Sequence, residues 1–216
     1  MRMYKVIVSA FRRASGDPSA RVARMLDAPD TVRQIEDELG SPVTVEPVLL
    51  DGGGEDGSDA AAAWSALEPA VSRIGPDMVL VLGYRPGAHG VCLERCAVNA
   101  GGATDGTELI PGDAAAYWTR LPLHRILRVF LGQVPASITS GPGDALAGAL
   151  TYRVLRQCAR TATLGGLLEL PDVKDSDAPL TFAGVSGRQM LEAARQTVSQ
   201  TLLYLADLRS DDRRSV

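Results

Sequence analysis

Asp77-Met-Val-Leu-Val-Leu-Gly83 is the stretch that indicates the fold most clearly. Its central residues are all apolar and lack the alternation that marks a strand with one solvent-facing side. A short, continuous apolar run of this kind is typical of a strand in a parallel sheet that helices cover on both faces. The segment therefore predicts an α/β protein with a buried strand at residues 77–83.

Helical and extended patterns alternate on both sides of this strand. Apolar runs predict strands, and apolar residues spaced by three and four predict helices. Pro47 interrupts the run Val43–Leu50, which indicates an edge strand or a bend because proline donates no ladder hydrogen bond. Residues 31–39 fit either a short helix or a connection. The other predicted strands are 4–9, 90–99, 136–139 and 164–170, and the other predicted helices are 18–26, 59–74, 121–132, 144–160 and 186–208.

This order of elements predicts one three-layer α/β/α domain with a mostly parallel, twisted sheet. A length of 216 residues suits a single domain. The sequence shows no internal repeat and no linker that would divide it. We therefore assign residues 1–208 to the domain and residues 209–216 to a polar C-terminal tail.

Charge and hydropathy exclude several classes of protein. The net charge is −4, which disfavours binding to nucleic acid or to anionic membranes. No apolar stretch reaches the ~18 residues that span a membrane. The apolar start of the chain ends at Phe11-Arg12-Arg13, too early for a signal peptide. We expect a cytoplasmic protein that binds a small molecule, and neither nucleic acid nor a membrane.

Potential metal ligands and nucleophiles are scarce. The two histidines and three cysteines form no paired Cys-x-x-Cys or His-Glu-x-x-His pattern, so we predict no metal. An odd number of thiols in a chain of this length predicts no disulfide framework. The glycine-rich loop at residues 51–58 is acidic and would repel phosphate, so no nucleotide is expected. We predict no cofactor.

Residues 83–100 carry the most specific motif, Gly83-Tyr-Arg-Pro-Gly-Ala-His-Gly-Val-Cys-Leu-Glu-Arg-Cys-Ala-Val-Asn-Ala100. It resembles the pyroglutamyl peptidase I (pyrrolidone-carboxyl peptidase) family, in which a strand and a Gly/Pro-rich turn precede an L-E-R-x-A-V-N block. Four further segments agree with that family in order and spacing. They are residues 6–11, 116–122, 141–152 and 166–171. The resemblance covers nearly the whole chain and implies the family's fold.

The resemblance also implies where the family's catalytic residues would lie. In that family a cysteine thiolate at a helix N-terminus attacks the amide beside the pyroglutamyl ring, a histidine takes its proton, and an acid orients the histidine. Counting back from Tyr152 and from Pro171, the cysteine position is Ala147 and the histidine position is Glu169. Of the three residues only the acid, Glu94, remains.

The three thiols do not restore the nucleophile. Cys158 lies eleven residues beyond Ala147 on the same predicted helix, roughly 16 Å away. Cys92 and Cys96 flank Glu94, and neither follows a helix N-terminus. We interpret all three as ordinary buried thiols and predict no cysteine peptidase activity.

The first loop is altered as well. In the family it carries two phenylalanines that enclose the lactam ring, and here Phe11 is kept while Ala14 takes the place of the second. Arg12 and Arg13 lie between them. Because this loop follows a strand at the ligand-binding edge of an open α/β sheet, either arginine could hold a substrate carboxylate. The alternative is a solvated pair of surface arginines.

Tyr84, His89 and Ala147 complete the predicted substrate-binding residues. His89 lies in the turn before Glu94, and the small Ala147 would leave room for a larger ligand. The arginine that follows this turn in the family falls on Ala88. The resembled family commonly forms dimers or tetramers, so we expect a homodimer or a homotetramer.

Glu94 and Glu169 are the candidate catalytic residues. If Glu169 faces Glu94, as the resemblance implies, the pKa of one carboxyl should rise. We predict a repurposed, non-peptidase enzyme in which Glu94 shuttles protons on a small anionic substrate, with a ring-forming Pictet–Spengler-type condensation as the candidate reaction. The alternative is an inactive relative that binds a ligand or partner, with Glu169 turned to solvent.

Overall fold

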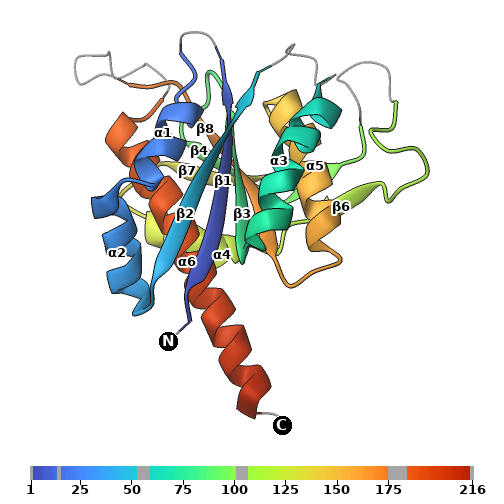
Figure 1. Cartoon of the computed structure of the whole chain (residues 1–216). Helices are drawn as coiled ribbons and strands as arrows, with labels where there is room; N and C mark the ends of the chain where they lie inside the picture. The colour runs from blue at the N-terminus through green and yellow to red at the C-terminus, as the bar shows by residue number, and fades with distance from the viewer. Residues whose placement is uncertain (1, 14–15, 53–58, 101–106, 175–183, 215–216) are drawn as a thin grey trace.

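The computed structural model describes residues 2–13, 16–52, 59–100, 107–174 and 184–214. A six-stranded sheet has the order β2-β1-β3-β8-β4-β7, and β5 pairs with β6 in a separate two-stranded sheet (Figure 1). The strands are β1 Tyr4–Arg12, β2 Val43–Asp51, β3 Met78–Tyr84, β4 Val91–Glu94, β5 Cys96–Val98, β6 Ala116–Trp118, β7 Ala136–Thr139 and β8 Leu164–Leu170.

Helices cover both faces of the large sheet, which confirms the predicted α/β fold. One face packs against α1, α2, α4 and α6, and the other packs against α3 and α5. The helices are α1 Ser19–Leu26, α2 Pro29–Leu39, α3 Ala60–Ile74, α4 Leu123–Phe130, α5 Ala145–Cys158 and α6 Gly187–Arg214. The segment at residues 31–39, which fitted either a helix or a connection, is therefore helical.

The strand at residues 77–83 lies inside the sheet, as its apolar composition predicts. β3 is parallel to β1 on one side and to β8 on the other. All its residues except Tyr84 are buried. β2 is an edge strand, in agreement with the interruption by Pro47.

The extended run predicted for residues 90–99 divides between the two sheets. β4 pairs antiparallel with β8, so that Cys92 lies opposite Glu169. The chain then leaves the large sheet, and β5 pairs with β6, a strand that the sequence analysis did not predict. Cys92 and Glu94 thus share one strand, whereas Cys96 belongs to a different sheet.

The C-terminal helix is longer than its apolar pattern predicts. α6 continues to Arg214, so much of the segment assigned to a polar tail is helical, and its lower end extends beyond the sheet (Figure 1). Arg209 donates a hydrogen bond of 2.8 Å to Asp77, which precedes β3 and is buried. This contact anchors the end of the helix to the start of the central strand.

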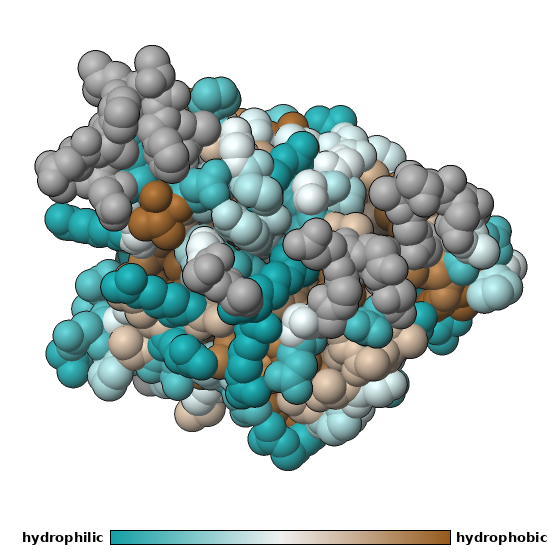
Figure 2. Space-filling model, turned by 90° about the horizontal axis from the view of Figure 1, so that it is seen from above, coloured by the Kyte–Doolittle hydropathy of each residue, from teal (hydrophilic) through white to brown (hydrophobic). Residues whose placement is uncertain are grey.

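The carboxyl ends of β1, β3 and β8 meet at one edge of the sheet. The chain continues from them into Arg13, Arg85 and Asp172, and α5 begins beside them. Figure 2 looks down on this end of the molecule, where hydrophilic residues lie around the middle of the view. Open α/β sheets bind ligands at such an edge.

Candidate functional site

Asp144 joins three of the loops at this edge. It caps α5, since its Oδ1 accepts a hydrogen bond of 3.0 Å from the backbone N–H of Ala147. Its two oxygens also accept hydrogen bonds of 2.7 and 2.8 Å from Arg13. The backbone N–H of Tyr84 donates to Oδ2 at 3.0 Å. The residue that caps α5 therefore also fixes the loops after β1 and β3.

Glu169 lies next to this cap, near the end of β8. Its side chain is fully buried, and its oxygens accept hydrogen bonds of 2.9 Å from the backbone N–H of Asp144 and from Arg85 Nη1. Burial raises the pKa of Glu169 to about 7, because desolvation of the carboxylate outweighs its hydrogen bonds to Asp144 and Arg85. The nearby charge of Glu94 raises it further. Glu169 therefore does not turn to solvent.

Glu94, at the end of β4, shares the same guanidinium. Arg85 Nη1 lies 3.4 Å from Glu94 Oε1, and the hydroxyl of Thr139 donates a short hydrogen bond to the same oxygen. Glu94 is 2% exposed, and its other oxygen, Oε2, is buried without a hydrogen-bond partner among the described residues. The site thus holds two buried carboxyl groups on one arginine nitrogen, with one acceptor oxygen unused.

Ala147 and Glu169 adjoin each other around Gly83 on β3. A methyl group placed on Gly83 would lie 3.0 Å from the Cβ of Ala147 and 3.3 Å from the Cγ of Glu169. The positions that the resemblance gives to a thiol and an imidazole are therefore neighbours in space. Ala147 is fully buried in this packing, so the room predicted for a larger ligand is not found at its side chain.

Tyr84 lies on the rim of this cluster. Its hydroxyl donates a hydrogen bond of 2.5 Å to Asp172, and the backbone N–H of Gly87 donates to the same carboxylate at 2.6 Å. The hydrogen bond to Asp172 raises the pKa of Tyr84 to about 12. Asp172 thereby fixes both ends of the turn that follows β3, the turn on which Arg85 lies.

The structure corrects the predicted roles of Phe11 and Arg12. Phe11 is 1% exposed and packs in the core between the sheet and the α3–α5 layer, so its ring does not line an open pocket. Arg13 covers that ring, with its guanidinium carbon 5.2 Å from the ring centre. Arg12 points outward and pairs loosely, at 3.4 Å, with the exposed Asp51. Successive residues of a strand face opposite sides, which explains why these two arginines diverge.

Arg13 and His89 also differ from their predicted roles. Arg13 is committed to Asp144, and a second carboxylate, Asp17, lies 3.8 Å away, so it does not present a free guanidinium to a substrate carboxylate. His89 is exposed, and within the described part of the chain no hydrogen bond or ion pair links it to the cluster. Of the predicted residues, the structure brings together Glu94, Glu169 and Ala147, with Arg13 and Tyr84 at the rim.

The sequence analysis did not predict three residues of this site. They are Arg85, Thr139 and Asp172. Each follows or ends a strand at a sheet edge, and the argument that singled out Arg12 and Arg13 applies equally to Arg85, which follows β3. The position of Arg85 directly after a predicted strand could therefore have identified it as a site residue from the sequence. Thr139 and Asp172 could be identified only from the pairing of β7 with β4 and from the geometry of the turn after β3.

Two of the three thiols, Cys92 and Cys158, are buried as predicted, whereas the third is not fully buried. Burial raises the pKa of Cys92 and raises that of Cys158 to about 12, so neither is a ready thiolate at neutral pH. Cys96 is half-buried on β5. In the described ranges, no group of three or more His, Cys, Asp or Glu side chains could hold a metal ion. No described helix combines the length and apolar character needed to cross a membrane.

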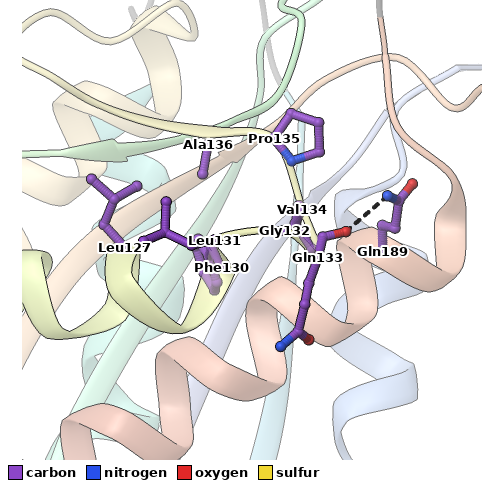
Figure 3. Close-up of a pocket in the computed structure, with 9 residues that line it drawn as sticks. All are labelled: Leu127, Phe130, Leu131, Gly132, Gln133, Val134, Pro135, Ala136 and Gln189. Atoms are coloured by element: carbon purple, nitrogen blue, oxygen red, sulfur yellow. Dashed lines mark hydrogen bonds between the residues drawn. The ribbon is translucent and has the colours of Figure 1, made fainter.

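A separate pocket of about 480 Å³ lies between α4, β7 and the start of α6 (Figure 3). It is lined mainly by apolar side chains such as Leu127 and Leu131, and Gln189 donates a hydrogen bond of 3.0 Å to the backbone oxygen of Gln133 at its side. None of its lining residues has an ionisable side chain. This pocket therefore offers no acid–base chemistry, unlike the cluster around Arg85.

Comparison with known proteins relates the chain to peptidases. The family model described as pyroglutamyl peptidase matches residues 59–185. The pyrrolidone-carboxylate peptidase of Bacillus subtilis is 26% identical over 161 residues, which are 69% of this chain and 75% of that protein. That of Pyrococcus furiosus is 25% identical over 186 residues, 79% of this chain and 82% of the relative. The crystal structure of pyroglutamyl peptidase I from Bacillus amyloliquefaciens matches with a TM-score of 0.75 and 19% identity, covering 94% of this chain and 97% of that chain.

These comparisons confirm the predicted fold and overturn the predicted reaction. The matching family and both relatives are peptidases by name, and nothing among them indicates a cyclase, a Pictet–Spengler condensation or alkaloid biosynthesis. The prediction failed because a carboxylate that exchanges protons is common to many reactions and does not identify one of them.

Proposed function

Because the chain belongs to the pyroglutamyl peptidase family, we propose that it hydrolyses the amide bond after a pyrrolidone-carboxylate residue at the amino end of a peptide. We propose further that water, and not a thiol, is its nucleophile. Ala147 and Glu169 occupy the positions that the resemblance assigns to the thiol and the imidazole. No sulfur therefore lies at the start of α5, and the reaction would depend on the carboxyl groups that remain.

The observation that carries this proposal is the arrangement of Glu94 and Glu169 on a single nitrogen of Arg85. Two carboxyl groups that share a site and one cation favour a state in which one is protonated and the other ionised. The pKa of Glu169, about 7, allows that state near neutral pH. Such a pair supplies a proton acceptor and a proton donor at the same time, as peptidases that activate water require.

The proposed steps start from the unpaired oxygen of Glu94 and from the protonated form of Glu169. None of the described residues forms a hydrogen bond with Glu94 Oε2, so this oxygen can accept a proton from a water molecule whose oxygen bonds to the amide carbon. The protonated Glu169 gives its proton to the amide nitrogen as the carbon–nitrogen bond breaks. The products are a pyrrolidone-carboxylic acid and a peptide with a free amine. The pair still carries one proton, now on Glu94, and transfer of that proton to Glu169, directly or through solvent, restores the starting state. Atoms and charges balance without an oxidant or a metal.

The test uses the purified chain and a pyroglutamyl aminomethylcoumarin amide. We expect fluorescence release by the wild type that survives treatment with iodoacetamide. Glu169→Gln and Glu94→Gln should each lower kcat/KM by about 100-fold or more, in the range typical of general acid–base groups. Glu68→Gln, which changes an exposed glutamate on α3, is the matched control and should retain full activity. No release by the wild type between pH 5 and 8 would overturn the proposal.

The remaining expectations are proposals as well. We propose that the chain forms a homodimer or a homotetramer and that it is cytoplasmic. Both rest on the resemblance and on the sequence patterns described above. Light scattering coupled to size-exclusion chromatography tests the first, since a mass near the 22.8 kDa of a single chain would overturn it.

A further inference from the structure

Arg85 has hydrogen-bond donors that the cluster does not use. A guanidinium carries five N–H groups, of which two are on Nη1. Nη1 serves Glu169, Glu94 and the backbone oxygen of Gly141, at 2.9, 3.4 and 3.1 Å. Nε and Nη2, with the other three N–H groups, have no hydrogen-bond partner within the described part of the chain, and the side chain is 31% exposed. Arg85 therefore holds the carboxyl pair with one nitrogen and presents unused donors beside it.

The backbone and the packing fix Arg85 in this position. Its own N–H donates to the backbone oxygen of Leu170 at 2.9 Å, which joins the turn after β3 to the end of β8. Its stem crosses Gly143, where an added Cβ would lie 2.5 Å from Cγ, 2.9 Å from Cδ and 3.0 Å from Nε. Only a residue without a side chain permits this approach. The guanidinium is thus held in place before any ligand binds, the condition under which donors stabilise developing charge most effectively.

We propose that Arg85 is a catalytic residue whose Nε and Nη2 bind the carbonyl oxygen of the scissile amide and stabilise the oxyanion that forms when water attacks. This inference rests on the proposed function. It assigns a role to a residue that the resemblance does not cover, since the family's arginine after this turn falls on Ala88.

The other arginines at this edge do not offer the same chemistry. Arg13 is bound by both oxygens of Asp144. Arg12 is directed outward to Asp51. Arg85 alone among these three touches the carboxyl pair, so an oxygen bound to its free nitrogens would lie next to the groups that move protons. With one carboxyl protonated, the positive charge of Arg85 is balanced by a single carboxylate, and the forming oxyanion then meets less repulsion.

The kinetic test separates oxyanion binding from mere positioning of the carboxyl groups. Arg85→Lys keeps a positive charge but loses the fork of donors, and it should lower kcat by about 100-fold while KM changes by less than about threefold. Gly143→Ala should have a similar effect because it displaces the stem of Arg85. Arg33→Gln, which removes an exposed arginine from α2, is the control and should keep full activity. Circular dichroism and melting temperature show whether each variant is folded.

A rescue experiment gives a readout that a structural role would not produce. Arg85→Ala supplemented with millimolar methylguanidine should regain at least tenfold in kcat, whereas ammonium chloride at equal ionic strength should not. A variant that loses activity only through a shifted pH–rate profile, with no rescue at its own optimum, would show Arg85 to be a positioning residue and would overturn the proposal.

A binding measurement keeps this inference distinguishable from the proposed function. The probe is 2-pyrrolidone-5-carboxamide, titrated calorimetrically into the wild type and into Arg85→Ala. If the wild type hydrolyses no substrate yet binds this amide at least tenfold more tightly than the variant, the proposed function fails and the carbonyl-binding role of Arg85 stands. Equal affinity in both proteins, or no binding by either, overturns that role.

Discussion

The guanidinium of Arg13 and the carboxylate of Asp144 form two parallel hydrogen bonds, of 2.7 and 2.8 Å, between positions 131 residues apart in the chain. Asp144 is 5% exposed and also caps α5, so one side chain links the loop after β1 to the helix that carries Ala147. The ion pair between Arg13 and Asp144 thus stabilises the edge of the sheet at which Glu94 and Glu169 lie.

Removal of either partner should destabilise the protein because it leaves a buried charge without its counterpart. Arg13→Gln should lower the free energy of unfolding by about 2–4 kcal/mol. Asp144→Asn keeps a good capping residue, so Asp144→Ala should cost about 1 kcal/mol more than Asp144→Asn. Urea unfolding measures all three. Arg12→Gln is the control and should change stability by less than about 0.5 kcal/mol, and an equal loss in Arg12→Gln and Arg13→Gln would contradict this account.

The protonation of Glu169 should make stability depend on pH. Burial raises the pKa of this carboxyl from 4.5 to about 7 in the folded protein. Between these values the folded protein holds a proton that the unfolded chain has released, so the free energy of unfolding falls as the pH rises. The loss amounts to about 3 kcal/mol and is complete above pH 7. Glu169→Gln cannot ionise and should lack this slope. Urea unfolding at pH 5, 6, 7 and 8 compares the wild type with Glu169→Gln. The same dependence of the free energy of unfolding on pH in both proteins would disprove the raised pKa of Glu169.

The three thiols should differ in reactivity. Burial raises the pKa values of Cys92 and Cys158, so few thiolates form there at pH 8, whereas Cys96 is half-buried on β5. Iodoacetamide should therefore label Cys96 at least tenfold faster than the other two in the folded protein. Peptide mass spectrometry gives the rate for each residue. Faster labelling of Cys92 would indicate an activated thiol next to Glu169, and a thiol mechanism would then need to be considered.

The end of α6 should contribute to stability. Asp77 accepts hydrogen bonds of 2.8 Å from both Arg2 and Arg209 and is 6% exposed. A chain that ends after Leu208 loses one of these cations, and its free energy of unfolding should fall by about 1–2 kcal/mol. A chain that ends after Ser210 keeps Arg209 and serves as the control. Equal unfolding midpoints for the two truncated proteins would show that the contact does not matter.

The sequence predicted the large sheet well because its signals are local. The apolar run at residues 77–83 and the interruption at Pro47 each depend on the residue types of a short segment. The prediction was weaker at residues 90–99, where one extended pattern divides between two sheets. The same β conformation serves both sheets, so only pairing with β8 or with β6 separates them.

The candidate site was predictable only in part. The motif at residues 83–100 and the spacing to Tyr152 and Pro171 drew attention to Glu94, Ala147 and Glu169. Arg85 was missed although it follows a central strand, because the resemblance directed attention to Ala88. The reaction type was wrong because acid–base residues are shared by many enzymes, and the comparison with known peptidases corrected it.

The sequence by itself determined the α/β architecture, the absence of a cysteine at residue 147 and the presence of two glutamates at residues 94 and 169. Only the tertiary structure decided that the glutamates share one nitrogen of Arg85, that Phe11 is buried beneath Arg13, and that burial raises the pKa of Glu169 to about 7. The reason is physical. Secondary structure follows from the spacing of side chains along the chain, whereas a pKa and an ion pair depend on which distant groups exclude water from one another.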